Sequence, residues 1–366
     1  MTTLALPTID EEIWRYSRIN ELDLSTYAPG TVQTVVSGAD GVLATNPHDH
    51  VGVAMSSDPD VFATMNRTSP DVVALVVPRG AVHPQTVIVE RTVASSGIVA
   101  FPRLVIDAGE NSEVTVIERF TSADGVASLV VPVAEIRAAQ SARVTYLAIN
   151  ELGANTWQIG HQLAVGERDS TVKVFTVALG GDYARVRAEV KLVGQGASAQ
   201  QTALYFADST QMHDFRTLQT HEAPRTHSDL LFKGAVKDTA KSVYTGLIKI
   251  TENATKSEAF QTNRNLTLSH GAWAESVPNL DIETNDVRCS HASTVGPIDP
   301  EQRFYLESRG VSPEVAERLI VLGFFDEVLE QLPLPAMAAQ LRARVAAKLD
   351  GVARSEEHTS ELQSRE

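Results

Sequence analysis

Short runs of β-branched and other apolar residues recur between about residues 70 and 290, and they constrain the fold more than any other feature of the sequence. Many of these runs alternate apolar and polar residues, which is the period of a β-strand, and Gly, Asp, Asn and Ser separate them. The clearest are Val72–Val77, Thr86–Arg91, Val114–Phe120, Ser128–Val133, Arg143–Ile149, Thr156–Leu163, Thr171–Leu179 and Arg185–Val193. No helical run of ten or more residues separates them, so βαβ units are not expected.

Many short strands at even spacing are typical of a sandwich, a barrel or a β-helix. The last four runs begin 13 to 15 residues apart. A stretch of about 220 residues is long for one sandwich, whereas a solenoid grows by adding turns. The sequence therefore favours a mainly β protein with a β-helix core, over residues 66–296.

The regions on either side of the strands have a different pattern. Residues 1–65 form a helical or irregular region, because Asp10–Leu24 opens with an acidic cap and carries Ile13, Trp14, Ser17 and Ile19 at roughly helical spacing. Residues 297–353 form a helical region. The residues that support this prediction are Asp299, Pro300 and Gln302 as a helix start, Gly310 as its end, Ser312 and Pro313 as a second start, Val315, Leu319, Ile320 and Leu322 as an apolar face that Gly323 interrupts, and Ala336–Leu349 as a last helix.

Composition excludes several classes of protein. A net charge of −15 argues against nucleic-acid binding, which needs a basic surface. No apolar run is long enough to span a membrane, and the N-terminus lacks the pattern of a signal peptide, so the cytoplasm is the expected location. The single cysteine excludes an internal disulfide. The chain also lacks a P-loop for ATP.

The last residues, 354–366, have no apolar periodicity and no helix caps. The stretch RSEEHTSELQS matches the in-frame translation of a widely used sequencing-library adapter. We therefore expect this segment to be non-native and leave it out of fold reasoning, as for any cloning scar. The native sequence beyond residue 353 is then unknown.

Cys289 and His291 are the strongest metal-ligand candidates. In a strand, residues two apart point to the same face, so a thiolate and an imidazole would be presented together. These ligands suit zinc or iron–sulfur chemistry, but a closed site needs about four of them. The pair therefore either borrows ligands from a second chain or is a buried cysteine beside an ordinary histidine. His48 and His50 could also form a metal pair, but a polar loop is the simpler interpretation.

Two long segments, Thr220–Ile250 and Gln261–Gly310, closely resemble the SufB/SufD family of iron–sulfur cluster assembly scaffolds. The stretches CSHASTVG and FYLESRG are similar to the SufD branch in particular, and the further cysteines of the SufB branch are missing. The resemblance is strong over residues 219–325 and weaker elsewhere. One departure is that Ala292 and Ser293 stand where the family usually has Gly-Ala, and both replacements are small.

The resemblance implies a right-handed parallel β-helix with helical segments at both ends. It also implies a SufBCD-type complex in which this chain is a non-catalytic scaffold, paired with a SufB subunit and docked to the SufC ATPase. In such a complex, Cys289 and His291 would contribute to a site for iron or a transient iron–sulfur cluster at the interface with SufB. The isolated chain would hold no cluster stably. No flavin motif is visible.

The expected SufC-binding surface combines aromatic residues with arginine at the start of the helical region. Such residues are enriched among those that dominate binding energy. The surface consists of Phe304, Tyr305, Leu306 and Arg309, together with the helix at Pro313–Leu322. The alternative is that Phe304 and Leu306 pack the helix onto the end of the solenoid.

Two other functions remain open at this point. A polysaccharide-active β-helix enzyme needs paired carboxylates, and Asp281 and Glu283 share a strand face, although no export signal precedes them. A purely structural β-solenoid would leave the Cys-x-His pair and the helical C-terminal region without a purpose.

Overall fold

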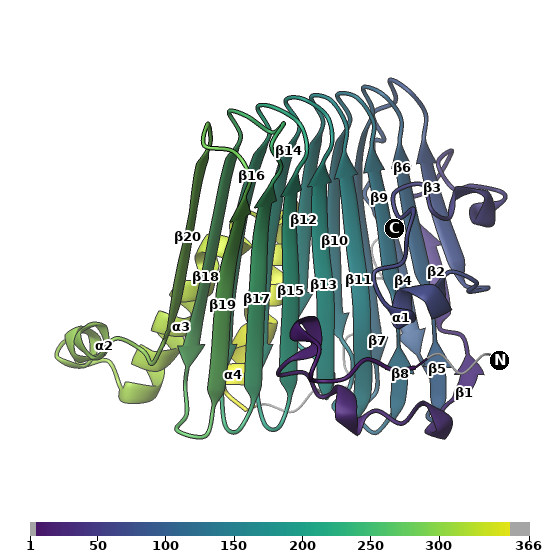
Figure 1. Ribbon diagram of the computed structural model, residues 1–366. Coiled ribbons are helices and arrows are strands. Elements are labelled where there is room, and N and C mark those ends of the chain that lie inside the picture. The colour runs from purple at the N-terminus through teal and green to yellow at the C-terminus, as the bar shows by residue number, and fades with distance from the viewer. Residues whose placement is uncertain (1–4, 352–366) are drawn as a thin grey trace. The chain divides into compact units, whose positions relative to one another are not determined.

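The computed structural model describes residues 5–351, so the predicted adapter-derived segment lies outside the described residues. The chain divides into two compact units, Met1–Pro297 and Ile298–Glu366. The first unit is a parallel β-solenoid in which successive strands alternate between two sheets that pack face to face (Figure 1). The mainly β fold with a parallel β-helix core is thereby confirmed.

One sheet has eleven strands and the other nine, and every strand pair is parallel except the pair β2 and β4. The larger sheet contains β1 (Ala28–Gly30), β3 (Val72–Val77), β5 (Ile98–Ala100), β6 (Arg103–Ala108), β8 (Ser128–Val130), β9 (Val133–Ala138), β11 (Thr156–Gly166), β13 (Tyr183–Leu192), β15 (Met212–His221), β17 (Lys241–Ile250) and β19 (Trp273–Ile282). The smaller contains β2 (Gln33–Ser37), β4 (Val87–Val93), β7 (Glu113–Ser122), β10 (Arg143–Glu151), β12 (Thr171–Ala178), β14 (Ser198–Ala207), β16 (His227–Val236), β18 (Glu258–Thr267) and β20 (Arg288–Gly296).

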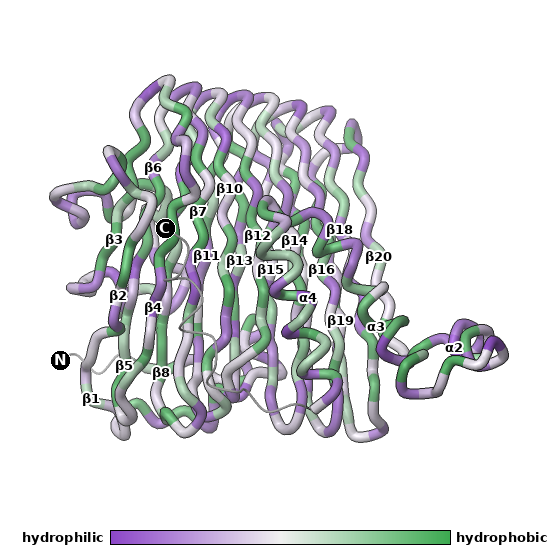
Figure 2. The backbone as a smooth tube through the Cα atoms, turned by 180° about the vertical axis from the view of Figure 1, so that it is seen from behind, coloured by the Kyte–Doolittle hydropathy of each residue, from purple (hydrophilic) through white to green (hydrophobic). Residues whose placement is uncertain are grey.

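Residues in register on successive turns stack into columns inside the solenoid. Val114, Val144, Val172 and Ala199 form one such column, and all four are buried. Hydrophobic and hydrophilic residues alternate along many of the strands (Figure 2). Branched side chains suit this arrangement, because they pack well on a pleated surface against the residues above and below.

One corner of the solenoid repeats on every turn and fixes the register. A residue with positive φ stands there each time, and its N–H donates to a carbonyl of the next turn. The residues at this corner are Asn111, Ser141, Asp169, Gly196, Arg225 and Lys256. The repeated left-handed corner explains why the strand pairing continues without slipping for many turns.

The interior becomes polar toward the C-terminal turns. The Tyr205 hydroxyl donates to Asn265 Oδ1 at 2.6 Å and accepts from Asn263 Nδ2 at 2.9 Å. His221 is buried with its two ring nitrogens hydrogen-bonded to hydroxyl groups, and burial lowers the pKa of this imidazole to about 4. These turns are therefore held by a hydrogen-bonded core as well as by apolar packing.

Gly234 makes room for the Tyr205 ring in this polar core, which gives a first prediction. A Cβ atom at position 234 would lie 1.9 Å from a ring carbon, and moving the ring would break both of its hydroxyl hydrogen bonds. We expect Gly234→Ala to lower the free energy of unfolding by about 1–3 kcal/mol, measured by chemical denaturation. Gly296→Ala is the control, because a Cβ there meets no atom within 4 Å. Equal stability of the two variants would contradict the packing described here.

The N-terminal segment crosses the outer face of the larger sheet (Figure 1). It contains the 3₁₀ turns η1 (Glu12–Trp14), η2 (Ile19–Glu21), η3 (Leu24–Thr26) and η4 (Pro47–His50) and the short helix α1 (Val61–Asn66). Within Asp10–Leu24 the helical spacing gives two short 3₁₀ turns and no continuous helix. Tyr16 has a φ of 69° and breaks the chain into two turns, because buried Arg185 and Arg216 instead hold the carbonyls of Ile13 and Arg15.

The second unit contains α2 (Pro300–Glu307), α3 (Pro313–Leu329) and α4 (Pro335–Leu349). The side chains of Asp299 and Ser312 cap α2 and α3 as the sequence predicts. The expected apolar face of α3 is right for Leu322, which is buried, and wrong for Val315 and Leu319, whose side chains are half exposed because Val321 and Phe325 complete the buried face. The helix itself continues through Gly323. Among the residues that the structure describes, no helix has the length and apolar content needed to cross a membrane.

Candidate functional site

The last turn of the solenoid, formed by β19 and β20, is open on one side. In the described part of the chain, β19 hydrogen-bonds to β17 alone and β20 to β18 alone. Trp273, Leu280, Ile282 and Val295 on these strands expose 37–42% of their surface. Unpaired edge strands with exposed apolar side chains are sites where another chain can add. We call β19 and β20 the open rung.

Cys289 and His291 lie on β20 and point to the same side of it. Cys289 pairs in register with Ala259 on β18, and His291 pairs with Gln261. Ala259 and Gln261 are buried in the solenoid interior, so their in-register neighbours face the interior side of the open rung. The same-face arrangement expected from the Cys-x-His spacing is therefore what the structure has.

The two side chains differ in their surroundings. Cys289 is half-buried and packs against the cluster of Ile248, Ile250 and Ala259, and this burial raises the pKa of its thiol. His291 is exposed. A thiol with a raised pKa is protonated at neutral pH, so iron would have to displace its proton on binding.

These two residues supply only half of a metal site. Within residues 5–351 there is no group of three or more His, Cys, Asp and Glu side chains placed to hold a metal ion. A tetrahedral site takes about four ligands. His48 lies exposed in the 3₁₀ turn η4, close to His50 in the sequence, and that turn belongs to no such group either. Two further ligands must therefore come from outside the described chain if the pair binds metal.

The carboxylates considered for a polysaccharide enzyme are engaged elsewhere. Asp281 and Glu283 both pair with the Lys249 ammonium, at 3.3 Å and 3.4 Å. Hydrogen bonds and charge from the two carboxylates raise the pKa of Lys249. The two acids thus share one cation, an arrangement that gives no support to a paired general acid and nucleophile.

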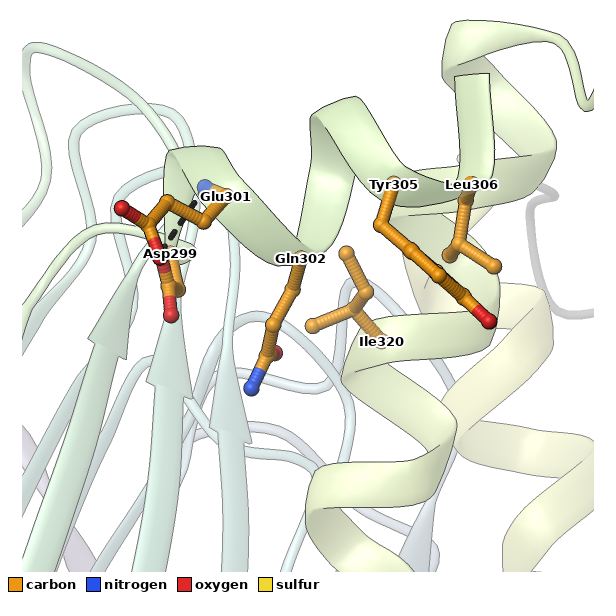
Figure 3. Close-up of a pocket in the computed structure, with 6 residues that line it drawn as sticks. All are labelled: Asp299, Glu301, Gln302, Tyr305, Leu306 and Ile320. Atoms are coloured by element: carbon orange, nitrogen blue, oxygen red, sulfur yellow. Dashed lines mark hydrogen bonds between the residues drawn. The ribbon is translucent and has the colours of Figure 1, made fainter. Parts of the chain in front are cut away.

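The residues expected to meet SufC lie on and just after α2. Phe304 and Tyr305 expose 72% and 55% of their surface, and the Arg309 guanidinium lies 4.3 Å from the centre of the Tyr305 ring. Leu306 lines a hollow of about 440 Å³ (Figure 3). Its other lining residues are Asp299, Glu301, Gln302, Tyr305 and Ile320.

The sequence interpretation missed one residue of the candidate site. Gln261, which pairs in register with His291, is 1% exposed, and neither atom of its amide has a hydrogen-bond partner in the described structure. Its distance of 30 positions from His291 equals one turn of the solenoid. If the turn length had been known, counting back one turn along the sequence from His291 would have identified Gln261.

A comparison with family models decides which family this is. The model described as the SufBD core domain of the SUF system for FeS cluster assembly matches residues 91–324. The chain belongs to the SufBD family. The resemblance inferred from the sequence motifs is confirmed, and the chain is accordingly a component of iron–sulfur cluster assembly.

Individual relatives agree with this assignment. An iron–sulfur cluster assembly SufBD family protein of Mycobacterium tuberculosis is 33% identical over 93% of this chain and 88% of its own length. The iron–sulfur cluster assembly proteins SufD of Escherichia coli and Bacillus subtilis are 30% and 31% identical. Those matches cover 68% and 70% of this chain, and 59% of each SufD protein.

Proposed function

We propose that this SufBD-family chain is a non-catalytic scaffold that pairs with a SufB-type subunit and docks a SufC-type ATPase. Cys289 and His291 are its contribution to an iron or nascent-cluster site shared with the SufB-type subunit. The observation that carries the proposal is the position of these two ligands, which face the same side of the last strand of the solenoid. Iron and the cluster are the cargo of this site.

The open rung supports pairing with a second solenoid. Among residues 5–351, neither β19 nor β20 pairs with a further strand, and the apolar side chains of the open rung, Trp273 and Leu280 among them, are partly exposed. Partner strands added to β19 and β20 would cover the exposed side chains of each strand, and the one on β20 would bring its own residues within reach of His291. The contact that joins the two subunits would therefore also supply the ligands that Cys289 and His291 lack.

Co-purification tests the proposal. The tagged chain, produced in its native host, should bring down a SufB-type subunit and an ATPase with a P-loop. The Arg288 N–H bonds to Ser257 on the β18 side, so by alternation the Val295 N–H faces the open edge of β20. Val295→Pro should reduce recovery of the SufB-type subunit, because proline removes that edge N–H. Recovery of neither partner by the unaltered chain would contradict the proposal.

Docking of the ATPase gives a second prediction. Tyr305 and Arg309 stack on one another on the exposed side of α2, and residues of these types often dominate binding energy. We expect Tyr305→Ala and Arg309→Ala each to weaken binding of the SufC-type subunit by about tenfold or more, measured by calorimetry, with an unchanged melting temperature. Val35→Ala, at an exposed position on β2, is the matched control. Unaltered affinity in both variants would remove α2 from the docking surface.

A further inference from the structure

Gln261 presents an amide that the fold leaves without a hydrogen bond. It lies on β18, is 1% exposed, and both Nε2 and Oε1 lack a partner in the described structure. Leaving such a group buried and unpaired costs about 1–3 kcal/mol. Few buried polar groups in native proteins are unpaired, so each one calls for an explanation.

The residues beside Gln261 show that the fold can satisfy amides at this depth. Asn263, two positions along the same face of β18, donates to the Tyr205 hydroxyl at 2.9 Å and to the Phe232 carbonyl at 3.3 Å. Asn265, two positions further, donates to Asn263 Oδ1 at 2.8 Å. On this face, therefore, the unpaired amide is the one directly below His291.

The space for this amide is built into the neighbouring strand. Gly246 on β17 faces it, and a Cβ atom there would lie 2.3 Å from Gln261 Nε2. On the open rung, Pro278 is in register with Gly246 and His291 is in register with Gln261. The strand that carries this amide, β18, thus lies one strand beneath β20, and the backbones of neighbouring strands are about 4.8 Å apart.

We infer that Gln261 is a positioning residue for His291. Once a partner subunit covers the open rung, Gln261 Oε1 accepts the N–H of one imidazole nitrogen. The tautomer is then fixed, and the other nitrogen keeps its lone pair free for iron. Metal-binding histidines commonly donate their second N–H to an oxygen acceptor in this way. The inference rests on the proposed function, because it assigns His291 as a ligand.

The tautomer of His291 in the assembled complex tests this inference. The chain would be labelled with ¹⁵N-histidine, combined with unlabelled SufB-type and SufC-type subunits, and studied by NMR, with His291→Ala identifying the signal. We expect one tautomer in the unaltered complex and a mixture of both in Gln261→Leu. Gln261→Glu keeps an acceptor oxygen at this position and should restore the single tautomer.

Stability and function provide the other two measurements. Replacing an unpaired amide by an apolar side chain of similar size is close to neutral, so Gln261→Leu should melt no lower than the unaltered chain. It should nevertheless reduce, by at least tenfold, the growth that the gene restores to cells lacking this subunit. If Gln261→Leu does not fold, Gln261→Met, which is unbranched like glutamine, takes its place.

Gln201→Leu is the matched control. Gln201 is also buried with an unpaired Oε1, but it lies deeper, on β14. It should leave both the His291 tautomer and growth unchanged. A single tautomer and full growth in Gln261→Leu would overturn the inference. If both Gln261→Leu and His291→Ala restored full growth, the proposed function itself would fail. If Gln261→Leu restored full growth and His291→Ala did not, only the role of Gln261 would be removed.

Discussion

Glu135→Leu is expected to lower the free energy of unfolding by about 3–5 kcal/mol, because it leaves a buried charge unpaired. Glu135 on β9 and Arg103 on β6 are both 0% exposed and form an ion pair inside the first unit. The same carboxylate accepts the backbone N–H groups of Gly52 and Met55, each at 3.0 Å. One side chain therefore both neutralises Arg103 and fastens the N-terminal segment to the solenoid.

A double variant separates these two roles. Burial lowers the pKa of Arg103, and the charge and hydrogen bond of Glu135 oppose that shift. Glu135→Leu/Arg103→Leu removes both charges and should recover a large part of the lost stability, leaving the cost of the freed N–H groups. Chemical denaturation measures all three proteins. A single variant that loses less than about 1 kcal/mol, within the range of a surface pair, would contradict this account.

The first half of the solenoid was predictable because most inward positions of its strands are aliphatic, although Arg91, Glu118 and Tyr146 are buried there as well. β7, β10 and β12 carry alternating branched residues, so the period of two is visible in the sequence. From β14 onward the inward positions include Gln201, Asn263 and Asn265, which pair with groups on other turns. Their polarity hides the strand period, since an inward amide has the same sequence signature as an outward one.

Tertiary contacts explain the errors in the helical regions. The spacing of Ile13, Trp14 and Ile19 suggests a helix, but Arg185 stacks on the Trp14 ring and binds the Ile13 carbonyl, which an α-helix would use itself. In α3, Val315 and Leu319 share a face that packs less than the face of Val321 and Phe325. A helix with apolar residues on several sides does not reveal from sequence which side is buried.

The sequence predicted that the two candidate ligands point together, but it did not predict where in the fold they lie. Residues two positions apart on a strand share a face, so Cys289 and His291 were expected to point to the same side. The register of β20 with β18 places Gln261 below His291 and leaves β20 at the end of its sheet. No local sequence pattern encodes that register. Local spacing gives the direction of a side chain, and only the strand order gives its neighbours.

His291→Ala should abolish the function of this chain while leaving its fold and its complex intact. The imidazole is exposed on the open rung and forms no part of a core cluster, so its loss has little effect on stability. Imidazole is also a ligand that suits iron. Cys289→Ser should have a milder effect, because the half-buried thiol also packs against Ile248 and Ile250 and its pKa is raised.

The most direct measurement is growth of cells that lack their own SufD and depend on this gene for iron–sulfur cluster assembly. Ser290→Ala is the matched control, because Ser290 is exposed on β20 and, one residue from His291, points to the opposite face. The account predicts full growth with Ser290→Ala, reduced growth with Cys289→Ser and none with His291→Ala, although the His291→Ala complex still assembles. Full growth with His291→Ala, or a stoichiometric cluster bound by the isolated chain, would contradict the shared site.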